Sequence, residues 1–425
     1  MTGSDLRIRS IKADGVLNDF GYFVEFASAS DDDRMRLIYA PNGRGKTNFL
    51  KAVSAVVQPS PESLQSLIEI PLAQLNIEFA AGGSIAVTRK KGVTGAFAAT
   101  VRTPDARTPC RITVDPTDFA GRLYRRVWDD RDDYNAYATA VSRLSSGAIF
   151  IGDDRLAPPS DDAREAGRVE SPNYPARRRQ RTVSRLLETV ERMLTQSAFA
   201  SLSREREQAG IYAQITRTTL QGSQSITATA ARTQLETQIE RLLRDGSPLE
   251  KYRLLSMRQV REISGQISNA RSNHSQFPAL HRILTPYFAS LEQQIESLAP
   301  AQELIDTYVT SVNRFLDRKR LEFTASDGIR LHGRDGRQLH PENLSSGERH
   351  LLLLLSNAIL ATAEGQLMII DEPELSLGIE WQRDLLPELL RCSQSGAVQF
   401  LIASHSVQVM SSVDRSTIVR PSEAM

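Results

Sequence analysis

The residues best suited to chemistry lie in a glycine-rich loop near the N-terminus. The loop and the residue after it are Ala40, Pro41, Asn42, Gly43, Arg44, Gly45, Lys46, Thr47 and Asn48. The glycines let successive backbone N–H groups converge on an anion where a helix begins. Lys46 adds a positive charge for phosphate oxygens, and the Thr47 hydroxyl suits Mg²⁺. We therefore predict that residues 42–48 bind the phosphates of a nucleotide, with Ala40 in the place of the usual first glycine.

Two adjacent carboxylates form a second chemical element. Asp371 and Glu372 directly follow the apolar run 367–370, which predicts a buried strand. Such strands direct their C-terminal residues toward the ligand crevice of an open α/β sheet. Asp371 would bind Mg²⁺ through water, and Glu372 would polarise the attacking water as general base. By itself the pattern equally fits a strand that ends in solvated acids, but the phosphate loop favours the catalytic interpretation.

Strands and helices must bring these elements together. Short apolar or alternating runs predict strands at residues 22–26, 36–39, 75–79, 84–88, 148–151, 321–323, 329–331, 367–370 and 399–403. Apolar residues at helical spacing predict helices at residues 48–57, 346–362 and 380–392. Gly82 and Gly83 predict a hairpin turn. The order of elements after residue 346 predicts an α/β fold with a largely parallel sheet.

The middle of the chain differs in composition. Residues 157–175 are rich in Pro, Asp, Ser and Gly, whereas residues 181–315 carry helix-spaced apolar residues without strand signals. We expected helix breaks at Gly246, Pro248, Pro278 and Pro286. The domains predicted are an N-terminal head part at 1–156, a linker at 157–180, a helical insert (a lid or short coiled coil) at 181–317, and a C-terminal head part at 318–425.

A third segment resembles a known family. Leu344-Ser345-Ser346-Gly347-Glu348 is similar to the signature motif of ABC-type ATPases, in a variant typical of their SMC, Rad50, RecF and OLD-like branch. The resemblance implies that this segment, with the Ser345 hydroxyl and the Gly347 N–H, contacts a γ-phosphate bound on the opposite subunit. Ser345 and Glu348 also have the spacing of a helix capping box, which is compatible with that role.

The resemblance continues after the carboxylates. Residues 371–377 and then 381–382 are similar to RecF- and OLD-like ATPases, many of them subunits of anti-phage defence systems, and imply that Ser376 and Leu377 cross a dimer interface. That subgroup usually has His at the position of Gly378. His405 follows an apolar strand and resembles the switch histidine, which senses the γ-phosphate and holds the attacking water.

The family likeness covers residues 6–88 and 321–418 and carries expectations for the whole chain. It implies an ABC-type P-loop head, in which helices flank a mixed sheet beside an N-terminal β-hairpin lobe, with an all-α insert. It implies ATP and Mg²⁺ as ligands, and a head-to-head homodimer or higher even oligomer that encloses ATP. The glutamine loop of the family has no clear counterpart, although Asp154 or Arg155 lies at a suitable strand end.

Composition narrows the classes of partner. The 425 residues carry 52 basic and 51 acidic side chains, so bulk charge favours neither nucleic acid nor membrane. Two distant cysteines fit a reducing cytoplasm. The apolar run 351–360 is too short to span a bilayer, and the N-terminus lacks the apolar core of a signal peptide. Arg177–Arg181 could contact phosphates or be a solvated helix start.

The resulting hypothesis is a cytoplasmic ATPase that serves as sensor or regulatory subunit of an anti-phage defence complex, similar to Septu or PARIS ATPases. A separate nuclease or toxin, encoded nearby, would be the effector, since too few residues follow His405 for the Toprim nuclease of OLD-like relatives. The main alternative is a RecF- or Rad50-like DNA repair ATPase, with DNA as partner. A transporter ATPase subunit and a scaffold that binds ATP without hydrolysis are further alternatives, which the helical insert and Glu372 respectively disfavour.

Overall fold

The chain forms two compact units. The structure, a computed structural model, describes residues 6–26, 34–119, 128, 130–152, 174–206, 226–270, 275–364, 366–393 and 398–423. The first unit comprises Met1–Val183 and Leu344–Met425, and the second comprises Ser184–Asn343. The second unit is therefore an insertion between the two halves of the first.

A five-stranded parallel sheet lies in the first unit, with strand order β14-β3-β13-β12-β8. Its strands are β3 (Met35–Tyr39), β8 (Ala148–Ile151), β12 (Leu367–Asp371), β13 (Gln399–Ser404) and β14 (Ile418–Val419). Every pairing in this sheet is parallel. All residues of β12 and β13 are buried, as their continuous apolar sequences predict for central parallel strands. Their carboxyl ends, at Asp371 and Ser404, therefore lie at one edge of the sheet.

Helices pack on this sheet. Those in contact with its strands are α1 (Lys46–Val57) and α10 (Ser346–Glu364), and α11 (Ile379–Cys392) packs against α10 and the short α12 (Val407–Ser411). In α1 the buried residues Phe49, Leu50, Val53, Val56 and Val57 form one stripe at helical spacing. Through this helix the parallel sheet is joined to the second sheet of the unit, because α1 contacts β8, β12 and β13 as well as β1. The short helix η6 (Arg415–Thr417) also packs on β3.

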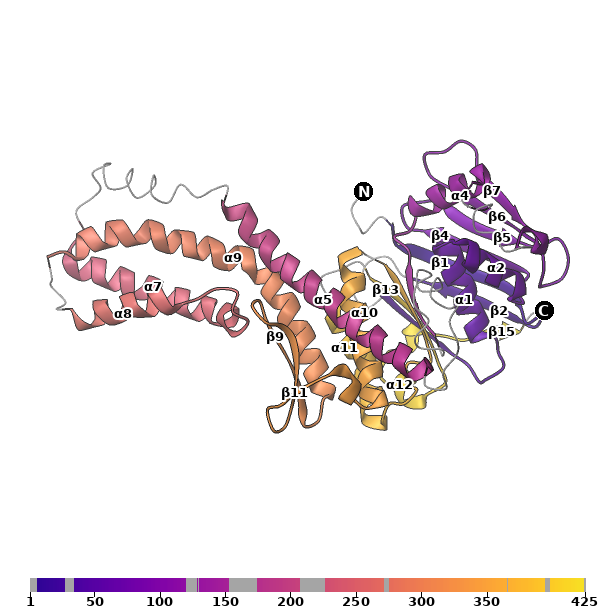
Figure 1. The fold of residues 1–425 in the computed structure, drawn as a ribbon. Helices are drawn as coiled ribbons and strands as arrows, with labels where there is room; N and C mark the ends of the chain where they lie inside the picture. Colours follow the sequence, from indigo (N-terminus) through magenta and orange to yellow (C-terminus); the bar gives the residue numbers. More distant parts are fainter. Residues whose placement is uncertain are drawn as a thin grey trace. The chain divides into compact units, whose positions relative to one another are not determined.

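A seven-stranded sheet forms the rest of the first unit, in the order β15-β2-β1-β4-β5-β6-β7 (Figure 1). Its strands are β1 (Ile8–Val16), β2 (Phe20–Glu25), β4 (Gln74–Phe79), β5 (Ser84–Thr88), β6 (Phe97–Arg102), β7 (Cys110–Val114) and β15 (Ser422–Glu423), and all pairings are antiparallel. The predicted hairpin turn at Gly82 and Gly83 is confirmed. This sheet is accompanied by α2 (Pro61–Glu69), α4 (Asp132–Ser142) and the short helix η3 (Pro116–Phe119).

Some elements of this sheet were missed by the sequence analysis. Strand β1 was not predicted, because its register shifts between Ala13 and Val16 and its buried residues therefore do not alternate. Strand β6 does alternate, but a small residue, Ala99, occupies one of its inward positions and weakens the apolar pattern. The predicted strands and helices elsewhere in the unit are confirmed to within two residues at most ends.

The second unit combines helices with a small sheet. The helices are α5 (Tyr174–Arg206, of which residues from Ser184 belong to this unit), α7 (Ala228–Lys251), α8 (Arg258–Asn269) and α9 (Phe277–Phe315). Helix α7 packs against both α8 and α9 (Figure 1). The sheet order is β11-β10-β9, from β9 (Lys319–Thr324), β10 (Gly328–Gly333) and β11 (Gln338–Leu339), and η5 (Pro341–Asn343) follows.

The β9–β10 hairpin, which the sequence analysis grouped with the C-terminal head, lies in the second unit. Strand β9 packs on α9, and the Asn313 side chain accepts from the Leu321 N–H (2.7 Å) and donates to the Leu321 carbonyl (2.8 Å). The Glu191 carboxylate accepts from the Ile329 N–H (2.9 Å). These bonds tie the hairpin to α9, which directly precedes it, and to α5.

The expected helix breaks have mixed outcomes. Pro278 marks the start of α9, as predicted, but Pro286 lies inside that helix. Gly246 and Pro248 lie inside α7. A Cβ on Gly246 would approach the Met257 sulfur to 2.5 Å, so the glycine makes room for a side chain. Of the expected linker, residues 157–173 lie outside the described residues, and residues 174–180 belong to α5. None of the helices in the described part of the chain combines the length and hydrophobicity needed to cross a bilayer.

Candidate functional site

The loop between β3 and α1 has the conformation that its glycines permit. Gly43 has φ 82° and Gly45 has φ 79°, in the left-handed region. A Cβ on Gly45 would come within 2.5 Å of the Val16 side chain, so only glycine fits there, whereas the space around Gly43 is open. Ala40 is not among the residues with positive φ, so alanine is accommodated at the start of the loop.

Lys46, the first residue of α1, lies inside the loop. Its ammonium group donates to the carbonyl oxygens of Ala40 (2.7 Å) and Pro41 (3.2 Å), and the residue is buried. No side chain caps the N-terminus of α1 at Gly45. The first N–H groups of an uncapped helix and a nearby ammonium group are the donors that an anion needs.

Arg44, also in the phosphate loop, contacts residues near the chain ends and not the interior of the loop. The Arg44 guanidinium lies over the Phe20 ring (4.8 Å to the centroid) and pairs with Glu423 (3.2 Å), while its carbonyl accepts from the Tyr22 hydroxyl (2.7 Å). Burial raises the pKa of Tyr22, and the nearby charge of Arg44 offsets part of this rise, so the phenol remains a donor. Asn42 is exposed and Asn48 is half-buried.

Thr47 and Asp371 meet although they are 324 residues apart in sequence. The Thr47 hydroxyl donates to Asp371 Oδ2 at 2.5 Å. Asp371 is buried at the end of β12, and Thr47 lies in the first turn of α1. A hydroxyl and a carboxylate oxygen in contact are hard ligands of the kind that Mg²⁺ prefers. Among the described residues no group of three or more His, Cys, Asp or Glu side chains could hold a metal ion.

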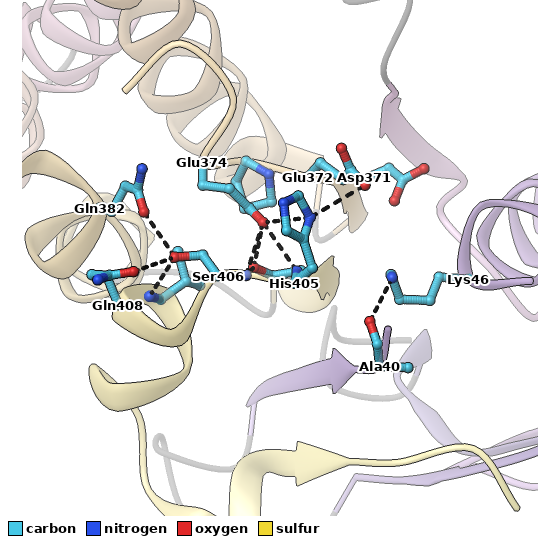
Figure 2. Close-up of polar contacts among 12 residues, drawn as sticks. Ala40, Lys46, Asp371, Glu372, Glu374, Gln382, His405, Ser406 and Gln408 are labelled. Atoms are coloured by element: carbon cyan, nitrogen blue, oxygen red, sulfur yellow. Dashed lines mark hydrogen bonds and ion pairs between the residues drawn. The ribbon is translucent and has the colours of Figure 1, made fainter. Parts of the chain in front are cut away.

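Glu372 and His405 also lie together at this edge of the sheet (Figure 2). His405 Nδ1 is 3.4 Å from Glu372 Oε1 and 3.3 Å from Glu374 Oε1. Glu372 has φ 51°, a left-handed conformation that costs a residue other than glycine about 1–2 kcal/mol. Its N–H donates to the Ala403 carbonyl (2.8 Å), which holds the strained residue against β13.

The signature segment forms the start of α10, which begins at Ser346. The Ser345 N–H donates to the Glu348 carboxylate (2.6 Å), and the Glu348 N–H donates to the Ser345 hydroxyl (3.2 Å), so the predicted capping box is confirmed. Gly347 lies against the loop after β12, because a Cβ there would be 2.7 Å from the Ser376 carbonyl oxygen. The His350 ring is 3.1 Å from the Pro373 carbonyl oxygen and makes a second contact between helix and loop.

Glu374, to which the sequence motif assigned no role, also lies at this edge of the sheet. Glu374 is buried, and its Oε1 accepts from the Ser404 hydroxyl and from the N–H groups of His405 and Ser406. The Ser406 hydroxyl donates to Gln382 (2.7 Å). A possible sequence signal is the pair of hydroxyl residues around His405, which need acceptors at the end of a buried strand.

Two predictions concern residues or side chains outside the described part of the chain. Asp154 and Arg155, the candidates for the glutamine loop, lie outside the described residues. Arg177–Arg181 lies in the described backbone of α5, but its side chains are outside the described part.

Comparison with known proteins identifies the family. The sequence profile of a family described as "AAA domain, putative AbiEii toxin, Type IV TA system" matches residues 194–411. The chain belongs to this AAA-domain family. The matched region includes the signature segment, Asp371, Glu372 and His405, whereas the phosphate loop precedes it. The resemblance to ABC-type ATPases is thereby confirmed at the level of the family. No curated protein matches the sequence of this AAA-domain chain.

Several solved structures are similar to this AAA-domain chain. One is the Smc head domain with an extended coiled coil, bound to the C-terminal domain of ScpA, from Pyrococcus furiosus (12% identity, TM-score 0.39, covering 98% of this chain and 96% of that one). Another is SmcHead bound to the C-winged helix domain of ScpA (10%, 0.39, 98% of each chain). A third is the SMC head domain from Thermotoga maritima (12%, 0.33, 99% of each). At this level of identity, the site must be interpreted from its own residues.

Proposed function

We propose that this protein binds and hydrolyses ATP at the carboxyl edge of its parallel sheet, and that two copies enclose the nucleotide. The observation that carries the proposal is the 2.5 Å contact between Thr47 and Asp371, which joins the phosphate loop to the carboxylates of β12. Glu372 and His405 lie beside that contact on the same edge. Such an arrangement serves phosphoryl transfer, in which positioning and charge do most of the work.

The phosphate-binding residues are 42–48. The uncapped N-terminus of α1 offers backbone N–H groups, and the exposed, open Gly43 lets a ligand approach the backbone closely. Lys46 donates to carbonyl oxygens of its own loop and would exchange them for phosphate oxygens when a nucleotide binds.

Thr47 and Asp371 would hold Mg²⁺, Thr47 directly and Asp371 through water. Their contact fits this role, because a small cation needs hard oxygen ligands already close together and completes its shell with phosphates and water. When bound, Mg²⁺ supplies positive charge that stabilises the phosphate oxygens during transfer.

Glu372 would accept the proton of the attacking water. His405 lies 3.4 Å from Glu372 through Nδ1, so its other ring nitrogen, Nε2, is left to contact the γ-phosphate or the water. The strained backbone of Glu372 supports a functional role, because such strain persists where the surrounding structure enforces it.

The signature segment would serve the site of the second copy. Ser345 and Ser346 are exposed at the start of α10, where backbone N–H groups and the helix dipole favour an anion. Gly347 and the capping carboxylate of Glu348 fix the shape of that start. In a two-fold dimer each copy would lend this segment to the other, so the complex has two equivalent sites.

The biological role that we propose is regulatory. The family description names a toxin and a type IV toxin–antitoxin system, which supports a function in defence. The ATP-driven joining of two heads would control a separate toxin or nuclease encoded nearby. Purification of the tagged protein from its native operon should yield that companion protein, and recovery of the ATPase alone with nucleotide present would contradict this role.

Two inactive variants test the shared site. Lys46→Ala removes the phosphate charge of its own site, and Ser345→Arg blocks the segment lent to the partner. Each variant alone should be inactive. In an equal mixture half of the dimers are mixed, and each mixed dimer has one intact site, so about a quarter of wild-type hydrolysis should return. The measurement is phosphate release by the mixture compared with each variant alone.

The mixture also has a clear negative outcome. If the wild type hydrolyses ATP but the mixture stays as inactive as its components, each chain completes its own site and the shared geometry is wrong. If the wild type releases no phosphate, hydrolysis itself is excluded. Stimulation of phosphate release by DNA would instead favour the DNA repair alternative.

A further inference from the structure

One buried carboxylate oxygen holds the turn that carries His405 (Figure 2). Glu374 Oε1 accepts from the Ser404 hydroxyl at 2.7 Å, from the His405 N–H at 3.0 Å and from the Ser406 N–H at 3.1 Å. Consecutive N–H groups that converge on one anion form a strong and rigid site. Hydrogen bonds to a charged acceptor are also about twice as strong as neutral ones. The end of β13 is therefore fixed by a residue that follows β12.

Glu374 lies on the same loop as Glu372. It follows Glu372 by two residues, on the loop that continues from β12, and it is 5% exposed. The residue between them, Pro373, is itself held through its carbonyl by His350 of α10 (3.1 Å). A displacement of Glu374 would thus move His405 relative to Glu372.

The same oxygen also faces the His405 ring. Nδ1 lies 3.3 Å from Glu374 Oε1 and 3.4 Å from Glu372 Oε1. Two acceptor oxygens around Nδ1 determine how the ring is turned, because a ring N–H seeks an acceptor and the second nitrogen must then point elsewhere. The Glu374 carboxylate therefore contacts both the backbone N–H and the ring of His405.

We propose that Glu374 is a positioning residue, which fixes the backbone and the ring of His405 beside Glu372 through the hydrogen bonds that it accepts. The inference rests on the proposed function, because it assigns to that site a residue that acts through His405. In this role Glu374 acts through His405 and does not itself touch ATP or the attacking water. Its loss should lower turnover much more than it weakens binding of ATP.

A purely structural role is the competing explanation, since any buried carboxylate with several donors stabilises a fold. Glu388 provides the matched control. It lies in α11 of the same unit, is 2% exposed and pairs with Arg391 at 2.7 Å. Removal of either buried carboxylate should be destabilising, because its donors lose their acceptor, but Glu374 accepts from the segment of His405, whereas Glu388 pairs with Arg391.

The experiment compares Glu374→Ala, Glu374→Gln and Glu388→Ala in the full chain. We expect Glu374→Ala to lower kcat by about 10–100-fold, typical for loss of a group that orients a reacting side chain, with KM for ATP little changed. Glu374→Gln retains an acceptor oxygen and should recover most of kcat. Glu388→Ala should lower the thermal midpoint and leave kcat near the wild-type value. If Glu374→Ala does not fold, Glu374→Asp replaces it, since the shorter side chain draws the oxygen away from its three donors.

Hydrogen exchange provides a readout that does not need activity. Glu374→Ala, or its Asp replacement, should speed exchange at the amides of His405 and Ser406, and Glu388→Ala should not. Unchanged exchange at these amides, a wild-type kcat in Glu374→Ala, or a loss in Glu374→Gln as large as in Glu374→Ala would each overturn the inference. If the wild type lacks ATPase activity, the proposed function fails, while the exchange data still decide whether Glu374 holds His405.

Discussion

The carboxylates of the two units are used in different ways. At the edge of the parallel sheet, Glu372 and Glu374 face one nitrogen of His405, and a single Glu374 oxygen accepts three hydrogen bonds. In the second unit, several carboxylates instead pair at the surface with exposed basic residues, as in Arg258–Glu262 (3.0 Å). Exposed pairs contribute about 0–1 kcal/mol, whereas loss of one partner from a buried pair costs about 3–5 kcal/mol.

This difference indicates what each region is built for. The sheet edge gathers buried charge and two strained residues, Glu372 (φ 51°) and Ser376 (φ 64°), which a fold selected only for stability would avoid. Of the described residues of the second unit other than glycine, Arg253 and Arg318 have positive φ, and both carry exposed side chains. We therefore expect substitutions at the edge to alter turnover, and substitutions in the second unit to alter stability.

The largest effect should come from Glu372→Gln. The glutamine keeps the size of the side chain but cannot accept a proton from water, so turnover should fall by about 10²–10⁴-fold. The thermal midpoint should change little, because no measured contact of Glu372 other than the one with His405 depends on its charge within the described part of the chain. Steady-state phosphate release and thermal unfolding of the full chain are the measurements.

An equally conservative substitution in the second unit sharpens this contrast. Glu250 pairs with Arg261 and accepts from the Met257 N–H, so Glu250→Gln removes a charge from a structural contact. It should lower the thermal midpoint and retain turnover. Comparable losses of turnover in Glu250→Gln and Glu372→Gln would contradict the proposal that the sheet edge serves turnover and the second unit stability.

Gly347→Ala should have the next largest effect. The new Cβ would lie 2.7 Å from the Ser376 carbonyl oxygen and 3.3 Å from the Trp381 ring, so the loop or the helix must move. Overpacking of this kind costs about 1–3 kcal/mol. Because the signature segment and the loop both face the proposed partner, we expect ATP-dependent dimerisation to weaken by about tenfold or more, since each 1.4 kcal/mol is a factor of ten.

Gly378 offers a control for that substitution. It precedes α11, has φ −63°, and has open space where a Cβ would be placed. Gly378→Ala should therefore leave dimerisation unchanged. The measurement is analytical ultracentrifugation of both variants in the Glu372→Gln background with ATP and Mg²⁺. Normal dimerisation of the Gly347 variant would show that the close contact with Ser376 is not needed.

The sequence predicted the parts of the site whose information is local. Residues 42–48 and the Asp371–Glu372 pair each follow a strand, and both were placed from short motifs and apolar runs. The bonds of Glu374 could not be predicted, because its donors lie 30 to 32 residues away and meet it only through the pairing of β12 with β13. Strand β1 was hidden for a related reason, since its bulge disturbs the alternation on which the prediction depends.

The same limit applies to the second unit. Helices were predicted from apolar spacing, but the unit to which β9 and β10 belong depends on contacts such as Glu191 with Ile329, 138 residues apart. Gly246 illustrates the limit, because a residue that usually interrupts helices is used inside α7 to admit Met257. Local propensity gives the type of element, whereas packing decides its extent and its neighbours.

The smallest predicted effect concerns Asp306 in α9. Its carboxylate accepts from Lys251 Nζ (2.7 Å) and from the Tyr252 hydroxyl (2.6 Å). Burial alone raises the pKa of Asp306, but the bonds from Lys251 and Tyr252 outweigh burial and lower it. A carboxyl group with a lowered pKa stabilises the fold above its unfolded pKa, near 3.9, and this contribution is lost as pH falls through the folded value.

Asp306→Asn should therefore lower the thermal midpoint of the full chain at pH 7 by about 1–3 °C, given the exposure of the pair. The difference from wild type should shrink as pH falls below about 4, because protonation removes the same charge from the wild type. Asp245→Asn is the control, since Asp245 is equally exposed (41%) but lies beside arginines alone. Its effect at pH 7 should be smaller, because no buried phenol depends on it. A pH-independent difference for Asp306→Asn would mean that packing of the side chain, and not its charge, joins α7 to α9.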